Sequence, residues 1–143
     1  MKLNNSSPIF EVIDLTWPAE EFHELSKWKL RKSLKGGKRV SAATSTETPA
    51  ISDIELAEDK MTSWRQEKLF MIRPDQNNLD EALKNRGYRF IDPTNIWSIS
   101  SKTLSLQQVP PVTAFSIYPP LAIQRELWMA NGIDASKIAI MDR

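Results

Sequence analysis

Residues 113–143, the C-terminal stretch of the sequence, set the strongest limit on the possible folds of this protein. Thr113–Tyr118 is a short β-rich run, a Pro-Pro pair follows it, Leu121–Asn131 has a strong helical pattern, and Lys137–Asp142 is a second apolar run. This order predicts a strand, a helix and a strand. Such a unit buries little apolar surface alone and normally opens a larger sheet. We therefore expect further polypeptide to complete the sheet that this stretch begins.

The composition narrows the class of protein. The 143 residues suffice for one domain, or for a small domain plus a fragment of another. With 41% apolar and 26% charged residues and no apolar run of membrane-spanning length, a soluble globular protein is expected. The first ten residues lack a signal-peptide core, and the absence of cysteine excludes disulfides, thiolate metal sites and cysteine nucleophiles. A cytoplasmic location is the resulting expectation.

The N-terminal part contains two short apolar segments. The run from Ile9 to Leu15 fits either a helix or a strand, so its type stays open. Thr16-Trp17-Pro18 is a typical helix start, because proline is favoured in the first turn. Ala19–Leu25 is expected to continue from it as a short helix.

A β-hairpin is predicted after this helix. Lys27–Leu34 alternates between apolar and basic residues, which indicates a half-buried strand with Trp28 and Leu30 on its apolar side. Gly36-Gly37 can adopt the positive φ angles of a tight turn, and Arg39–Thr46 is suited to return as the partner strand. The basic side chains would then face outward.

The clearest helix start of the chain follows a break at Thr48-Pro49-Ala50. Ser52 with Glu55 three residues later forms a capping box, so a helix is predicted from there to about Arg65. Its buried stripe would consist of Ile54, Ala57, Met61 and Trp64.

Three further elements are expected before the C-terminal stretch. Leu69–Ile72 is wholly apolar and predicts an inner strand, and a helix capped at Asn78 is expected to end at Gly87. Tyr88–Ser100 contains enough β-branched and aromatic residues to predict a strand. Ser101–Pro111 lacks periodicity in its second half and suggests a linker.

Few residues of the sequence suggest catalytic chemistry. His23 is the only histidine, so a catalytic triad or a histidine metal site would have to use it. Its acidic neighbours favour an ordinary surface position. Adjacent carboxylates, such as Glu20-Glu21, point in different directions and do not form a reaction centre. No catalytic residue and no metal site is therefore assigned.

The segment from residue 27 to residue 39 is strongly basic, although the net charge of the chain is only +1. It contains seven cations and no acid: Lys27, Lys29, Arg31, Lys32, Lys35, Lys38 and Arg39. Lys35-Gly36-Gly37-Lys38 lacks the spacing of a Walker loop, so a hairpin turn is expected, with contact to an anion as the alternative. The segment as a whole fits a solvated face or an interdomain contact, or else a surface for an acidic partner or nucleic acid.

An ordered series of segments suggests a family. The segments are Trp17-Pro18-Ala19, Gly36 to Thr44, Leu69 to Pro74, Leu79 to Asp92, and Pro119 to Gln124 continuing through Gly132-Ile133 to Met141-Asp142-Arg143. Together they resemble the N-terminal half of a bacterial GNAT-type N-acetyltransferase with two GNAT-like halves. The resemblance extends from about Phe10 to Arg143.

The resemblance implies an α/β fold, a GNAT-like mixed β-sheet flanked by helices that is incomplete at the C-terminus. Residues 1–105 would form a degenerate GNAT-like N-terminal domain and residues 106–112 a linker. Residues 113–143 would be the first strand, helix and strand of a second GNAT domain.

The implied activity is transfer of an acetyl group from acetyl-CoA to an amine of a small molecule or peptide. GNAT proteins hold acetyl-CoA with a loop of the pattern [QR]-x-x-G-x-[GA], and no segment here matches it. No cofactor-binding residue is therefore assigned, acetyl-CoA is expected only for the complete protein, and this chain alone is expected to be inactive. Gln124 and Trp128 are the residues that the resemblance places at the acceptor pocket.

The implied partner is the remainder of the same polypeptide, or a companion chain that completes the second domain. Neither a membrane nor nucleic acid is expected as a partner of such a protein. The alternative is a non-enzymatic binding or assembly module that uses the basic segment 27–39 on an acidic partner or nucleic acid.

Overall fold

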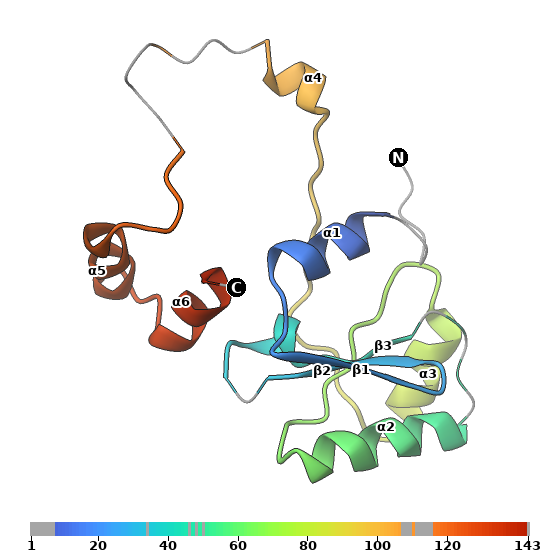
Figure 1. The fold of residues 1–143 in the computed structure, drawn as a ribbon. Coiled ribbons are helices and arrows are strands. Elements are labelled where there is room, and N and C mark those ends of the chain that lie inside the picture. Colours follow the sequence, from blue (N-terminus) through green and yellow to red (C-terminus); the bar gives the residue numbers. More distant parts are fainter. Residues whose placement is uncertain are drawn as a thin grey trace.

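The computed structural model describes residues 8–33, 35–45, 47, 49, 51–106, 110 and 116–142, which form a mixed α/β structure (Figure 1). The sheet in this part of the chain has three antiparallel strands in the order β1-β2-β3: β1 (Glu21–Leu25), β2 (Trp28–Lys32) and β3 (Thr44–Ser45). The helices are α1 (Pro8–Thr16), α2 (Ile51–Ser63), α3 (Asn77–Asn85), α4 (Ser101–Leu104), α5 (Ala122–Ala130) and α6 (Ala135–Met141), with a 3₁₀ turn, η1 (Lys38–Val40). The predicted α/β class is confirmed. None of these described helices has the length and apolarity needed to cross a bilayer.

The sheet lies between α1 on one face and α2 with α3 on the other (Figure 1). Trp28 and Leu30 of β2 point to the side of α2 and α3, where they are almost fully buried. The main core on this side consists of Trp28, Leu30, Ala43, Ile54, Ala57, Met61, Leu79 and Leu83. The strand and the apolar face predicted for residues 27–34 are thus confirmed for the described part, whereas Leu34 lies outside the described residues.

The other face of β2 is not the solvated basic face that the alternation predicted. Arg31 is only 3% exposed, because α1 covers this side of the sheet and presents Asp14 to its guanidinium. The prediction of outward-facing cations is therefore wrong for Arg31. Helix α1 also settles the type of the Ile9–Leu15 run, which is helical.

The helix predicted for Ala19–Leu25 is wrong, because Glu21–Leu25 forms strand β1. This strand pairs along its full length with β2, from Glu21 opposite Lys32 to Leu25 opposite Trp28. Phe22 faces α1 beneath the Lys29 ammonium, 4.7 Å from the ring centroid, and His23 faces the opposite way against Trp64. Neighbouring side chains of this segment thus lie on opposite faces, as the two-residue period of a strand requires. Pairing with β2 outweighed the weak helical preference of the local sequence.

The connection from β2 to β3 is longer than the predicted tight turn at Gly36-Gly37. Both glycines have positive φ angles, of 120° and 93°, but the chain then forms η1 and returns to β2 only at Thr44 and Ser45. Val40 of η1 is fully buried in a second, smaller cluster with Ala19 and Ile140. Burial of Val40 in this cluster therefore explains why Arg39–Thr46 does not form one continuous strand.

Helix α2 confirms the helix predicted from Ser52 to about Arg65, and it ends two residues earlier, at Ser63. Its buried stripe consists of Ile54, Ala57 and Met61, with Trp64 packed against the same core. The helix begins at Ile51, so Ser52 lies inside its first turn and is not the N-cap that the capping-box pattern predicted. The hydrophobic period, more than the cap, decided the position of this helix.

Residues 69–72 do not form the predicted inner strand, but Phe70 makes one parallel bridge to Ala43. The Ala43 N–H donates to the Leu69 carbonyl, and the Met71 N–H donates to the Ala43 carbonyl, both at 2.8 Å. Helix α2 forms the crossover between the two paired segments, as a parallel connection requires.

Two glutamine side chains stop this parallel pairing from extending. The Gln76 amide donates to the Ser45 carbonyl, and its oxygen accepts the Arg73 N–H, both at 2.9 Å. On the other side, Gln66 donates to the Ser41 carbonyl at 2.7 Å. The backbone groups that a longer ladder would use are thus occupied by side chains, which explains the single bridge.

Helix α3 confirms the predicted helix that ends before Gly87, but it begins at Asn77, so Asn78 lies inside its first turn and is not the predicted cap. Gly87 has a φ of +87°, and the Tyr88 N–H donates to the Leu83 carbonyl, which completes a Schellman motif. The strand predicted for Tyr88–Ser100 is wrong, since it has no regular structure and pairs with no described strand. Phe90, Ile91, Trp97 and Ile99 are exposed, with Trp97 at 90%, whereas Tyr88 packs against the main core.

In the C-terminal stretch, α5 confirms the predicted helix. It ends in a Schellman motif, in which the Gly132 and Ile133 N–H groups donate to carbonyls of the last turn. The strand predicted for Lys137–Asp142 is wrong, because residues 135–141 form α6. Asp134 caps α6 by accepting the Lys137 N–H at 3.0 Å, a start signal that the apolar run concealed.

The remaining C-terminal predictions are only partly covered by the structure. In the predicted strand Thr113–Tyr118, residues 113–115 lie outside the described residues, and residues 116–118 are not in a strand. The expected linker begins in α4, and the domain boundary at residues 106–112 falls largely on residues that are not described. The division into two domains stays a prediction.

Candidate functional site

The residues that the sequence placed at an acceptor pocket, Gln124 and Trp128, both lie on α5 and are half-buried. The Gln124 side chain accepts the Leu121 N–H at 2.7 Å, and the Trp128 carbonyl accepts the Ile133 N–H at 3.0 Å. Gln124 therefore caps the start of α5. Neither residue lines the two pockets described below, and their role in a substrate site stays a prediction.

His23 occupies the surface position that the sequence indicated. Its Nε2 lies 3.3 Å from the Glu21 carboxylate, and its ring packs against Trp64 at 4.9 Å between centroids. Among the described residues, no group of three histidine, aspartate or glutamate side chains could hold a metal ion.

Most cations of the basic segment 27–39 are paired with acidic side chains. The pairs are Lys27–Glu47 (3.7 Å), Lys29–Asp14 (2.8 Å), Arg31–Asp14 (2.7 Å), Lys32–Glu21 (2.8 Å) and Lys38–Asp92 (3.3 Å). Arg39 lies over the Trp17 ring. These partners come from distant parts of the sequence, so the local charge run exaggerates the positive charge of the folded surface.

The strongest of these pairs joins α1 to the sheet. Arg31 donates to both oxygens of Asp14, from Nη2 at 2.7 and 3.0 Å and from Nε at 3.0 Å, and Nη1 donates to Ala42 and Thr44. Burial acts to raise the Asp14 pKa, but the hydrogen bonds from Lys29 and Arg31 outweigh it and hold this pKa below its ordinary value. Asp14 is therefore ionised and structural.

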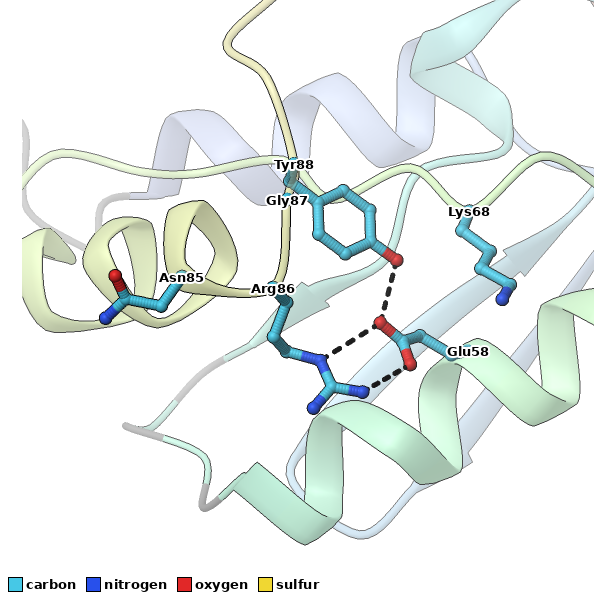
Figure 2. A pocket seen from close by; sticks show the side chains of 6 residues that line it. All are labelled: Glu58, Lys68, Asn85, Arg86, Gly87 and Tyr88. Carbon is cyan, nitrogen blue, oxygen red and sulfur yellow. Dashed lines mark hydrogen bonds and ion pairs between the residues drawn. The ribbon is translucent and has the colours of Figure 1, made fainter.

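The larger pocket, of about 650 Å³, is an open depression between the middle of α2 and the end of α3 (Figure 2). Its lining residues are Glu58, Lys68, Asn85, Arg86, Gly87 and Tyr88. Figure 2 shows the Glu58 carboxylate at its centre, with Arg86 and Tyr88 bonded to it and Asn85 turned away.

The hydrogen bonds around Glu58 occupy both of its oxygens. Arg86 donates to one oxygen from Nη2 at 2.7 Å and to the other from Nε at 3.2 Å, and the Tyr88 hydroxyl donates at 2.9 Å. The Arg86 hydrogen bonds lower the Glu58 pKa despite partial burial. Burial, together with the bond to Glu58, raises the Tyr88 pKa.

This arrangement can hold the end of α3 against α2, but it is poorly suited to proton transfer. A general base needs a pKa near the working pH and a free lone pair facing the substrate. The Glu58 pKa is shifted away from neutrality, and Tyr88 stays protonated. The Glu58, Arg86 and Tyr88 cluster is therefore a structural clamp.

The smaller pocket, of about 280 Å³, lies between the β2–β3 connection and the segment that follows α2. Its lining residues are Ser33, Lys35, Gly37, Lys38, Ser41, Arg65, Gln66, Glu67 and Leu69. The sequence singled out Lys35 and Lys38 as potential anion contacts but gave no reason to choose Arg65 or Gln66. Their proximity depends on the return of the chain after α2.

Gln66 fixes the floor of this smaller pocket. Its side-chain oxygen accepts the Ser33 N–H at 3.0 Å, and its amide donates to the carbonyls of Arg31 and Ser41 at 2.8 and 2.7 Å. One side chain thereby ties the end of β2 to the approach to β3. Three bonds to backbone groups make this floor rigid.

No protein-family model matches the chain, and no significant match was found among curated proteins or solved structures. Any assignment of function therefore depends on the residues and on the geometry described above.

Proposed function

We propose that this chain is the N-terminal portion of a GNAT-like N-acetyltransferase that transfers an acetyl group from acetyl-CoA to an amine. The ordered segments from Trp17 to Arg143 motivate this assignment, and one structural observation carries it. The sheet is antiparallel through β1, β2 and β3, and helix α2 then crosses over to place Phe70 parallel to Ala43. An antiparallel meander followed by such a crossover, through one isolated bridge, supports the mixed, helix-flanked sheet that we propose for the complete domain.

The position of the crossover also supports a degenerate first domain. In the GNAT family the cofactor loop connects the central strand to its helix, and under this proposal the corresponding segment would be the connection from β3 to α2. Residues 46–50 read Thr-Glu-Thr-Pro-Ala and contain no glycine. Without glycine, successive N–H groups cannot readily turn toward a pyrophosphate. Acetyl-CoA would accordingly be bound by the second domain of the complete protein.

In the complete protein the acceptor amine would attack the thioester carbonyl directly, forming an amide and releasing the coenzyme thiol. A general base must accept the proton of the amine. Glu58 and His23 do not fit this role, because Glu58 is fully hydrogen-bonded and His23 lies at the surface beside Glu21. Gln124 and Trp128 are proposed as walls of the acceptor pocket.

The proposal is tested by comparing this chain with the product of the full reading frame. Isothermal titration with acetyl-CoA should show no saturable binding to residues 1–143, and the longer product should bind it and release free thiol with an amine acceptor. Tight, stoichiometric binding to the short chain would contradict the missing-loop argument. A stop codon directly after Arg143, together with a monomeric folded product, would overturn the proposal itself.

The alternative of a polyanion-binding module receives less support. Five of the seven cations between residues 27 and 39 form ion pairs within the chain, which weakens the field that would attract nucleic acid. This alternative would be supported if the chain bound a polyanion and the affinity fell steeply with salt. The affinity should then also fall in Lys35→Ala, Lys38→Ala and Arg39→Ala.

A further inference from the structure

We infer that the smaller pocket is a binding site for the phosphate groups of a small molecule. The site lies between the β2–β3 connection and the C-terminal end of α2. In Figure 1 this is the end of the helix opposite to the connection from β3. The inference is therefore independent of the proposed acetyltransferase function and of its cofactor loop.

The lining charge favours a dianion. Lys35, Lys38 and Arg65 contribute three positive charges and Glu67 one negative charge, which leaves a net charge of +2. Lys35 and Arg65 form no ion pair with any residue that the structure describes, in contrast to most cations of the basic segment. Lys38 reaches Asp92 at 3.3 Å, but both side chains are more than half exposed, so this pair is weak.

The backbone at Arg65 provides a second, independent reason. Arg65 has a φ of +59° and ends α2, with the Gln66 N–H donating to the Met61 carbonyl at 3.0 Å. Glycine is the usual residue at this left-handed position, because a side chain is strained there. Strained non-glycine residues concentrate at ligand sites. Arg65 lines the pocket from this left-handed position, where glycine would be less strained.

The floor and the size of the pocket define the ligand class. Gln66 holds the backbone on both sides through three hydrogen bonds, so the site is formed before a ligand arrives. Ser41 donates to the Gly37 carbonyl at 3.1 Å and keeps the glycine turn in place. A volume of about 280 Å³ is at the lower limit for small-molecule pockets. It suits a compact anion such as phosphate or pyrophosphate, whereas an intact coenzyme A would not fit.

The test uses the chain of residues 1–143 and pyrophosphate, titrated calorimetrically at constant ionic strength, with inorganic phosphate and chloride as comparison anions. We expect saturable binding of pyrophosphate, weaker binding of phosphate and none of chloride. Lys35→Ala and Arg65→Gly should each weaken pyrophosphate binding by about tenfold, because each removes a charge-assisted contact. Glu67→Gln should strengthen it severalfold.

Arg65→Gly separates a ligand-binding role from a structural one. Glycine relieves the left-handed strain, so the midpoint of urea denaturation should rise while pyrophosphate binding falls. Lys102→Ala is the matched control, since Lys102 lies on the exposed helix α4 and its loss changes the net charge equally. The inference is overturned if the unaltered chain shows no saturable binding, if Arg65→Gly binds as tightly, or if Lys102→Ala weakens binding as much as Arg65→Gly.

Discussion

Asp14→Ala should be among the most damaging single substitutions in this chain, because it removes the carboxylate that neutralises a buried guanidinium. Arg31 is 3% exposed, and three of its five hydrogen bonds end on Asp14. After the substitution only Ala42 and Thr44 would accept hydrogen bonds from Arg31. The positive charge itself would stay buried between α1 and the sheet.

The expected loss follows from the burial of the two partners. Breaking a buried ion pair by removing one member costs roughly 3–5 kcal/mol, because the remaining charge is desolvated and unpaired. The Asp14 side chain is 12% exposed and the neighbouring Lys29 is 31% exposed, so solvent compensates part of the loss. We therefore expect a decrease of about 3 kcal/mol in the free energy of unfolding.

Urea denaturation followed by tryptophan fluorescence measures this loss, since Trp28 lies in the main core on the same strand as Arg31. Asp80→Asn is the matched control, because it removes a carboxylate from the surface pair with Lys84 and should change stability little. In a double-mutant cycle, the double variant Asp14→Ala/Arg31→Met should lose clearly less unfolding free energy than the sum of the losses in the two single variants. A loss below about 1 kcal/mol for Asp14→Ala would refute the buried pair.

The same pair predicts a pH dependence with a definite sign. The Asp14 pKa in the folded chain is below its ordinary value of 3.8. The stabilisation by the Asp14–Arg31 pair is therefore fully present above about pH 5. It is lost as the pH falls through the pKa of Asp14 in the folded chain. Acid unfolding should accordingly begin at a higher pH in Arg31→Met than in the unaltered chain, as measured by circular dichroism.

The remaining predictions concern the contact of α6 and the clamp on α3. Gly36 has a φ of +120°, and a β-carbon added there would lie 2.7 Å from Ile140 Cδ1. A β-carbon at Gly37 would meet no atom within 4 Å, so Gly36→Ala should lower the free energy of unfolding more than Gly37→Ala. Ile140→Ala should cost about 2–4 kcal/mol in urea denaturation, because the side chain is 2% exposed; an unchanged midpoint would show that α6 does not pack there. Tyr88→Phe should cost about 1 kcal/mol through its lost hydrogen bond, whereas Tyr118→Phe, at a residue 77% exposed, should cost nothing measurable.

Local sequence signals succeeded where an element is long and periodic or ends at glycine. Helices α2 and α5 were predicted from their helical patterns, and the end of α3 was predicted from Gly87. Strand β2 was predicted from alternation. These elements depend on interactions within a few residues along the chain, which a sequence displays directly.

Local signals failed where distant pairing or burial decides the conformation. Glu21–Leu25 is a strand because β2 is beside it, and Tyr88–Ser100 lacks regular structure because no described strand pairs with it. Whether these two segments have a strand partner cannot be read from a window of neighbouring residues. Lys137–Asp142 is a different case, because its helical conformation is set by a local cap at Asp134 that the apolar run concealed.

The candidate sites divide in the same way. Sequence patterns are enough to predict the core faces of β2 and α2, the surface position of His23 and the concentration of cations between residues 27 and 39. The pairing of most of these cations with acidic side chains is a result of the fold, since the partners lie as far away in the sequence as Asp92. The fold also brings Arg65 and Gln66 to the glycine turn, because the chain folds back after α2. Charge and periodicity are properties of the chain, whereas neutralisation and pocket formation depend on which distant residues the fold places together.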